Sequence, residues 1–106
     1  MANYIFAYHG GEQPKTPEEG KNMMEKWKGW IENLGSTMVN PGTPLGMSKT
    51  VSADGIADNG GSNPLTGYSV VGADSIEAAL EIAKGSPFLE IGGTIEVAEM
   101  KEKGSN

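Results

Sequence analysis

Residues 3–9 constrain the fold most strongly, because a strand there is apolar on both faces. Successive side chains of a strand point to opposite faces. One face carries aromatic rings and the other carries smaller side chains: Tyr4, Phe6 and Tyr8 against Ile5, Ala7 and His9. Such a strand needs cover on both sides. In a chain of 106 residues, helices can cover one side, and the other side needs a partner.

A helix is predicted over Pro17–Leu34, with clear signals at both ends. Thr16 is a favourable N-cap, Pro17 suits the first helical position and Glu19 completes a capping box. Gly35 stands where the helix should end. Apolar side chains recur at three- and four-residue spacing, as a core-facing stripe requires: Met23, Met24, Trp27, Trp30, Ile31 and Leu34.

The remaining segments predict further strands at residues 36–40, 67–73 and 94–100, a weaker extended piece at 47–52 and a helix at 76–84. Pro41 and Gly42 are expected to end the second strand, and residues 53–65 to form a long irregular loop. The order predicts a ferredoxin-like βαββαβ α+β sandwich, with both helices on one face of one sheet. The uncovered apolar face then predicts a homodimer paired through the sheet face.

The length predicts one domain over residues 1–100, followed by a disordered tail at 101–106. Composition narrows the classes of function. Cysteine is absent, which excludes disulfides, thiolate metal sites and a cysteine nucleophile. The net charge is −6 and every basic residue is lysine, so nucleic-acid binding is not expected. The first residues match neither a signal peptide nor a membrane span, and a cytoplasmic location is expected.

His9, the one histidine, is the first candidate for chemistry, because imidazole paired with a carboxylate transfers protons near neutral pH. Asp54 or Asp58 could supply that carboxylate if the loop folds back over the end of the first strand. A histidine that only hydrogen-bonds to backbone is the alternative. Four further residues could contact a ligand: Ser48, Lys49, Asn63 and Tyr68. One histidine among scattered carboxylates predicts no metal site.

Five short segments, in their order and spacing, resemble the YCII-related family. They are residues 4–9 (YIFAYH), 16–19 (TPEE), 67–71 (GYSVV), 73–79 (ADSIEAA) and 93–97 (GTIEV). The resemblance implies a dimeric α+β barrel, similar to muconolactone isomerase and its relatives, small enzymes that often work without a cofactor. It also implies a His–Asp pair, for which His9 with Asp54 or Asp58 is the match. Members associated with sigma factors carry Asp-Gly-Pro-Phe; here Asp54 and Gly55 are kept and the Pro-Phe is lost, which speaks against that link.

Two functions therefore remain open. The first is a cofactor-independent enzyme in which His9 is the acid or base and Asp54 or Asp58 orients it. The second is a non-catalytic homodimer that binds a small molecule or another protein.

Overall fold

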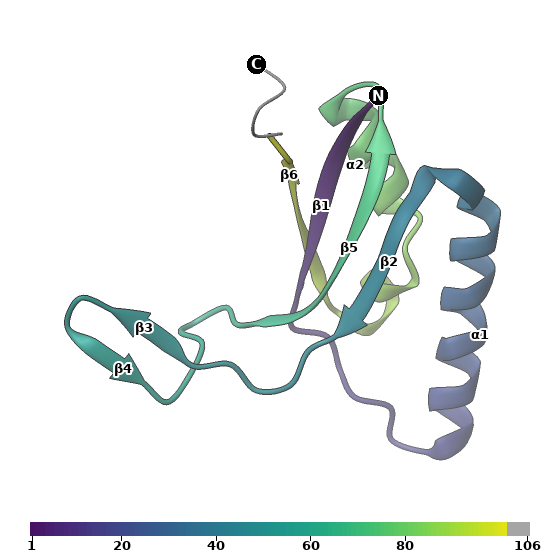
Figure 1. Cartoon of the computed structure of the whole chain (residues 1–106). Helices are drawn as coiled ribbons and strands as arrows, with labels where there is room; N and C mark the ends of the chain where they lie inside the picture. The colour runs from purple at the N-terminus through teal and green to yellow at the C-terminus, as the bar shows by residue number, and fades with distance from the viewer. Residues whose placement is uncertain (102–106) are drawn as a thin grey trace.

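The computed structural model describes residues 1–101, so the predicted tail at 101–106 lies outside the described residues except for Lys101. Four strands form the main sheet, in the spatial order β2-β5-β1-β6 and with antiparallel pairing throughout. They are β1 (Ala2–His9), β2 (Met38–Pro44), β5 (Leu65–Ala73) and β6 (Thr94–Glu99). The helices are α1 (Pro17–Leu34) and α2 (Ile76–Lys84), with short 3₁₀ turns at Gly35–Thr37 and Pro87–Ile91. This is the predicted ferredoxin-like order, with one hairpin added between β2 and β5 (Figure 1).

The predicted N-cap and the glycine at the end of α1 are confirmed. The backbone N–H of Glu19 donates to Thr16 Oγ1 at 3.1 Å, and Gly35 ends α1 with a φ of 55°. Ser75 caps α2, because its Oγ accepts from the N–H of Ala78 at 3.1 Å. The predicted stripe of α1 is wrong at Met24, whose side chain is exposed. Four other side chains of the stripe pack against the core on one side of the sheet: Trp27, Trp30, Ile31 and Leu34.

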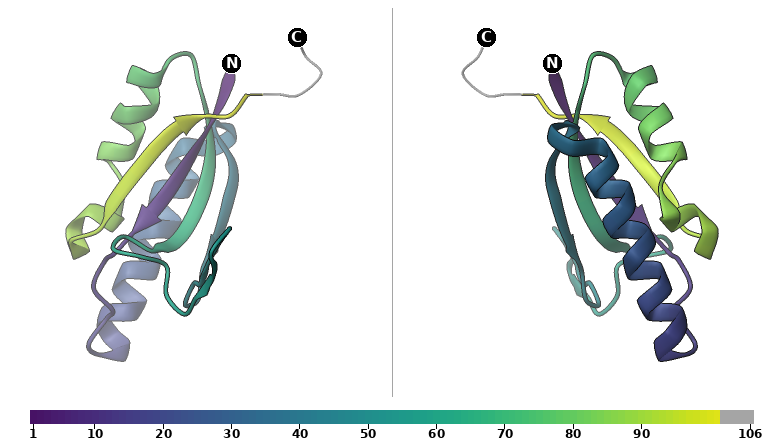
Figure 2. Two further views of the ribbon diagram at one scale, coloured as in Figure 1. Left: turned by 90° about the vertical axis from the view of Figure 1, so that its left-hand side faces the viewer. Right: turned by 90° about the vertical axis from the view of Figure 1, so that its right-hand side faces the viewer.

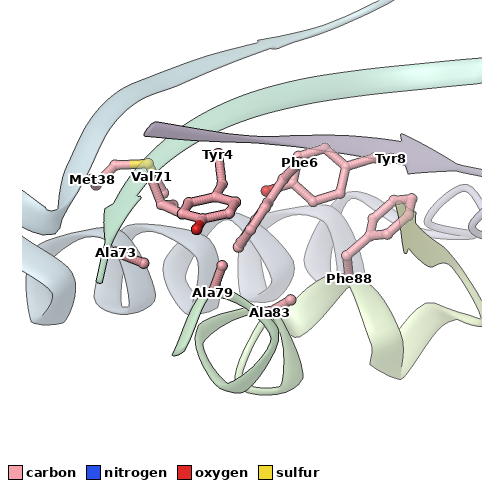
Figure 3. Close-up of a cluster of buried hydrophobic side chains, with 9 residues drawn as sticks. All are labelled: Tyr4, Phe6, Tyr8, Met38, Val71, Ala73, Ala79, Ala83 and Phe88. Atoms are coloured by element: carbon pink, nitrogen blue, oxygen red, sulfur yellow. The ribbon is translucent and has the colours of Figure 1, made fainter. Parts of the chain in front are cut away.

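The core lies between the helices and the aromatic face of β1 (Figure 3). Phe6 and Val71 are fully buried there, and the small residues Ala79 and Ala83 let α2 approach the sheet closely. The cluster comprises Tyr4, Phe6, Tyr8, Met38, Val71, Ala73, Ala79, Ala83 and Phe88. The two helices therefore cover one face of the sheet, as the order of elements predicted. Figure 2 shows α1 behind the sheet in one view and in front of it in the other.

β2 runs through Pro41 and Gly42, where the sequence predicted that it would end. Its pairing with β5 shifts register on either side of Asn40, so the two residues lie in a bulge. The Asn40 side chain accepts from the N–H of Gly42 at 2.8 Å, and Ser69 Oγ donates to the carbonyl of Pro41 at 2.9 Å. A proline is tolerated because β2 is an edge strand, where one side of the backbone needs no partner.

The predicted irregular loop at 53–65 is also wrong in part, because residues 53–57 belong to an ordered hairpin. Strands β3 (Thr50–Ser52) and β4 (Gly55–Ala57) pair with one another and form a second, two-stranded sheet. Residues 46–64, which include this hairpin, are called the arm below. Figure 1 shows the arm extending well away from the main sheet. Gly55 next to the two-residue turn has a φ of 128°, which few other residues adopt.

We expect Gly42→Ala to destabilise the fold by roughly 2–4 kcal/mol. Gly42 has a φ of 71°, and a Cβ there would overlap the backbone carbonyl of Tyr68. Gly46→Ala is the matched control, because a Cβ at Gly46 meets open space. Urea unfolding followed by circular dichroism measures both; equal unfolding free energies for the two variants would contradict the account of the bulge.

The Tyr8 hydroxyl makes stability depend on alkaline pH. Burial raises the pKa of Tyr8 to about 12 from 10.0, although the hydrogen bond that the hydroxyl donates to Ser69 Oγ opposes part of this rise. The contribution of Tyr8 to the free energy of unfolding is complete below pH 10, because the folded and the unfolded chain both keep the hydroxyl proton there. It is lost as pH rises toward 12, because only the unfolded chain then releases the proton, and two pKa units amount to about 3 kcal/mol.

Tyr8→Phe removes the hydrogen bond to Ser69, so at pH 8 this variant should be about 1 kcal/mol less stable than the wild type. The gap should shrink and reverse between pH 10 and 12. Thermal unfolding across this range measures it, and a gap that does not change with pH would refute the buried hydroxyl as the cause.

Candidate functional site

The open face of the sheet, opposite the helices, carries the residues of β1 that alternate with the core aromatics. Ile5 pairs with Val70 of β5, and Ala7 pairs with Tyr68. Ile5, Ala7 and Tyr68 are half-buried, whereas Val70 is buried and yet lies outside the core cluster. No helix among residues 1–101 covers this face (Figure 2). The two-sided apolar character expected of the first strand is thus realised.

His9 ends β1 on this open face and is buried within a single chain. Its Nδ1 lies 2.9 Å from the carbonyl oxygen of Asn63 and 3.3 Å from that of Pro64. Its Nε2 lies 3.0 Å from Oε1 of Glu96. Because Ala7 pairs with Glu96 across β1 and β6, Glu96 stands diagonally across from His9 on the same face. The imidazole is therefore held between the end of the arm and the edge strand.

The hydrogen-bond partners of His9 limit where its protons can lie. A carbonyl oxygen can only accept, so Nδ1 has to carry a proton. An ionised carboxylate also only accepts, so Nε2 and Glu96 Oε1 make a favourable contact only when one proton lies between them. The pair thus has an acid form with one shared proton and a base form without it. The Glu96 carboxylate is exposed, so this proton stands next to whatever occupies the open face.

Asp54 and Asp58, expected as the carboxylates beside His9, lie on the arm and are both exposed. The Asp58 carboxylate lies 3.5 Å from Lys49 Nζ, so two of the expected site residues meet one another. The backbone N–H of Asp54 donates to Ser52 Oγ at 3.2 Å, which shapes the turn of the hairpin. Within one chain, the carboxylate at the imidazole is that of Glu96.

The other three expected ligand contacts divide between the arm and the sheet. Tyr68 lies on the open face opposite Ala7, two residues before His9 on β1, and Asn63 reaches His9 through its backbone carbonyl. Ser48 lies at the base of the arm, where its Oγ is buried without a hydrogen-bond partner in the described chain and packs against Gly60. The structure thus brings His9, Asn63 and Tyr68 to one end of the sheet.

Sequence reasoning missed Glu96, although a signal for it exists. The last strand alternates Ile95 and Val97 with Glu96, which places the carboxylate on the face opposite the core. In the predicted fold the last strand pairs with the first, which also carries His9. What the sequence leaves open is the register, because a shift by two residues keeps the same face and separates Glu96 from His9.

Three further features complete the description of the site and its surroundings. Residues 1–101 contain no group of three His, Asp or Glu side chains placed to hold a metal ion. The helices in that part of the chain are too short or too polar to cross a membrane. A shallow hollow lies on the arm and is lined by Thr50, Ser52, Asp54, Gly55, Ile56 and Ala57. It includes neither His9 nor Glu96.

We expect the neutral imidazole of His9 to be the Nδ1–H tautomer, because two carbonyl oxygens face Nδ1. Long-range ¹H–¹⁵N NMR spectra distinguish the two tautomers, and a single histidine gives one unambiguous set of signals. Glu96→Gln should keep the Nδ1–H form, since its amide can donate to Nε2. Observation of the Nε2–H form in either protein would contradict the contact with Asn63.

The sequence matches no family model and no curated protein. The fold, however, is similar to that of a solved structure, 5-chloro-2-hydroxyhydroquinone dehydrochlorinase (TftG) from Burkholderia phenoliruptrix in complex with 2,5-dihydroxybenzoquinone. The match has a TM-score of 0.59 and covers 100% of this chain and 99% of the other, at 16% sequence identity. At that identity the likeness shows a shared fold, and this fold is the predicted ferredoxin-like α+β sandwich.

Proposed function

We propose that two copies of this chain pack their open sheet faces together, enclose a small organic molecule, and move a proton on it through the His9–Glu96 pair. One observation carries the proposal. The Asn63 carbonyl fixes His9 so that Nε2 meets the exposed Glu96 carboxylate on the one sheet face without helices. An imidazole oriented by one acceptor and paired with a carboxylate is a common arrangement for general acid–base catalysis.

The proton inventory defines the reaction class. In its base form the pair takes a proton from an acidic C–H or O–H of the substrate, and it becomes the acid form with the proton between Nε2 and Oε1. Return of that proton to a different substrate atom gives an isomerisation. Delivery of the proton to a leaving group gives an elimination. Both reactions balance without an oxidant or a reductant.

Two similarities support a small, oxygen-rich organic ligand. The solved structure of similar fold is described as a dehydrochlorinase in complex with 2,5-dihydroxybenzoquinone. The segments that resemble the YCII-related family imply small-molecule chemistry without a cofactor. Tyr68 on the open face supplies a hydroxyl and a ring next to the site, as planar aromatic or quinonoid ligands need. The arm residues Asp54 and Asp58 remain candidates only where a second copy brings them to the site.

A non-catalytic binding dimer is the second candidate, and one observation favours it. Both ring nitrogens of His9 already have partners in the free chain, and the ring is buried. A histidine with both ring nitrogens hydrogen-bonded can have a purely structural role, in which it links β1 to β6 and to the arm. In that case the same pocket binds a ligand and leaves it unchanged.

The experiment measures proton abstraction directly, without knowledge of the natural substrate. The protein is incubated in D₂O with a panel of hydroxyquinones and small β-dicarbonyl or hydroxy-acid compounds, and deuterium incorporation is followed by mass spectrometry. His9→Gln and Glu96→Gln should each slow exchange by about 10²–10⁴-fold, because an amide keeps the hydrogen bonds but cannot transfer a proton. Glu81→Gln is the matched control, since Glu81 is an exposed glutamate paired with Lys84 on α2.

Binding is measured in parallel by titration of 2,5-dihydroxybenzoquinone against the protein, with its visible absorbance as the signal. Binding without exchange for any member of the panel favours the non-catalytic dimer. Exchange at the wild-type rate in His9→Gln excludes His9 as the acid or base.

A further inference from the structure

The arm, residues 46–64, exposes apolar side chains in a way that a free surface loop rarely does. Met47 is 99% exposed, Val51 76% and Ile56 73%. Val51 and Ile56 are directly paired across the hairpin, so both side chains lie on the same face of the ribbon. Its few charges partly cancel, because Lys49 pairs with Asp58. In a single chain, Val51 and Ile56 therefore form an exposed apolar pair on one face of the hairpin, next to the Lys49–Asp58 ion pair.

The hairpin is also too small to be held in place by its own pairing. It has three residue pairs, and every residue of β3 and β4 is exposed. An isolated two-stranded hairpin of this length is marginally stable in water, and additional packing is needed to order it. The contacts that stabilise the arm along its length have to come from another molecule.

The direction in which the arm extends indicates that the molecule packed against it is a second copy of this chain. Figure 2 shows that the arm and α1 lie on opposite sides of the main sheet, so the arm extends on the side of the open face. It leaves the body at one end of the strands and runs outward, past the open face rather than back across it (Figure 1). Anything packed on the open face is therefore flanked by the arm. A second copy brings an open face and an arm of its own, and a twofold axis satisfies both needs at once.

We propose that the arm of each copy clasps the other copy, with Val51 and Ile56 buried against the partner, and closes one end of the space between the two open faces. This inference rests on the face-to-face pairing in the proposed function and is independent of its chemistry. The site is then incomplete in a single chain, because the rim of each pocket comes from the partner's arm.

The root of the arm connects this clasp to His9. Asn63 and Pro64, the last residues of the arm, supply the two carbonyl oxygens at Nδ1. Just beyond them, Thr66 Oγ1 donates to the carbonyl of Tyr8 or of Gly10, at 3.2 Å in each case. Fixing the arm on a partner therefore also fixes the acceptors that orient the imidazole. When the arm of one copy packs against the other copy, the position of His9 in the first copy is therefore fixed as well.

Paramagnetic NMR tests the clasp without any ligand or activity. Because the chain has no cysteine, Ile56→Cys gives a single site for a nitroxide label. Spin-labelled protein without ¹⁵N enrichment is mixed with ¹⁵N-enriched wild type, which carries no label, so any broadening arises between copies. We expect amide signals of the enriched copy to lose more than half their intensity. Met24→Cys, equally exposed at 73% but on α1, should cause none.

Light scattering at micromolar concentration supplies the second measurement. Val51→Asp combined with Ile56→Asp should weaken self-association at least tenfold, whereas Met24→Asp should not. A wild-type mass equal to one 11.1 kDa chain, or a dimer without intermolecular broadening from residue 56, overturns the clasp. The second of these outcomes leaves the His9 chemistry untouched. Deuterium exchange at the wild-type rate in His9→Gln would refute that chemistry and leave the clasp untouched.

Discussion

β1 lies between β5 and β6 and carries apolar side chains on both faces, and this constraint decides how the rest of the molecule packs. Both helices pack against its aromatic side chains on one face of the sheet, and the core lies there. Its smaller side chains leave the other face apolar, with no element of the described chain over it. The burial of Phe6 against α2 and the open position of Ile5 are two results of one alternating pattern. A sheet with this composition is finished only when something packs on its second face.

Local signals in the sequence predicted the helices well, because capping and periodicity act within a few residues. Thr16 and Gly35 mark the ends of α1 as the structure has them. The middle of the chain was predicted poorly for a physical reason. Proline and glycine at 41 and 42 commonly end a strand, yet here a bulge, an Asn40 side chain and a buried serine hold them in β2. The bulge and the hydrogen bond from Ser69 depend on β5, which is far away in the sequence, so no local pattern indicates them. Only the bond between Asn40 and Gly42 is local.

The candidate site shows the same division. His9 stands out in the sequence because it is the single histidine, and alternation places it on the open face. The neighbours of His9 depend on strand register and on the course of the arm. The pairing of β1 with β6 brings Glu96 to His9. Asn63 contributes a backbone carbonyl, which every residue type has, so the sequence gives no sign of it. Asp54 and Asp58 were plausible carboxylates by composition, but an ordered hairpin carries them away from the body of their own chain. Side-chain chemistry can be read from a sequence more readily than the positions of main-chain acceptors.

The prolines of β2 have a consequence for growth of the sheet. Pro41 and Pro44 lie on one of its two edges and offer no N–H to an approaching strand, and the bulge between them bends the backbone out of register. The opposite edge, β6, contains no proline. A further strand can therefore add only at the β6 edge. Two copies that joined through their β6 edges would leave only β2 edges free, so the sheet would not grow into a fibre.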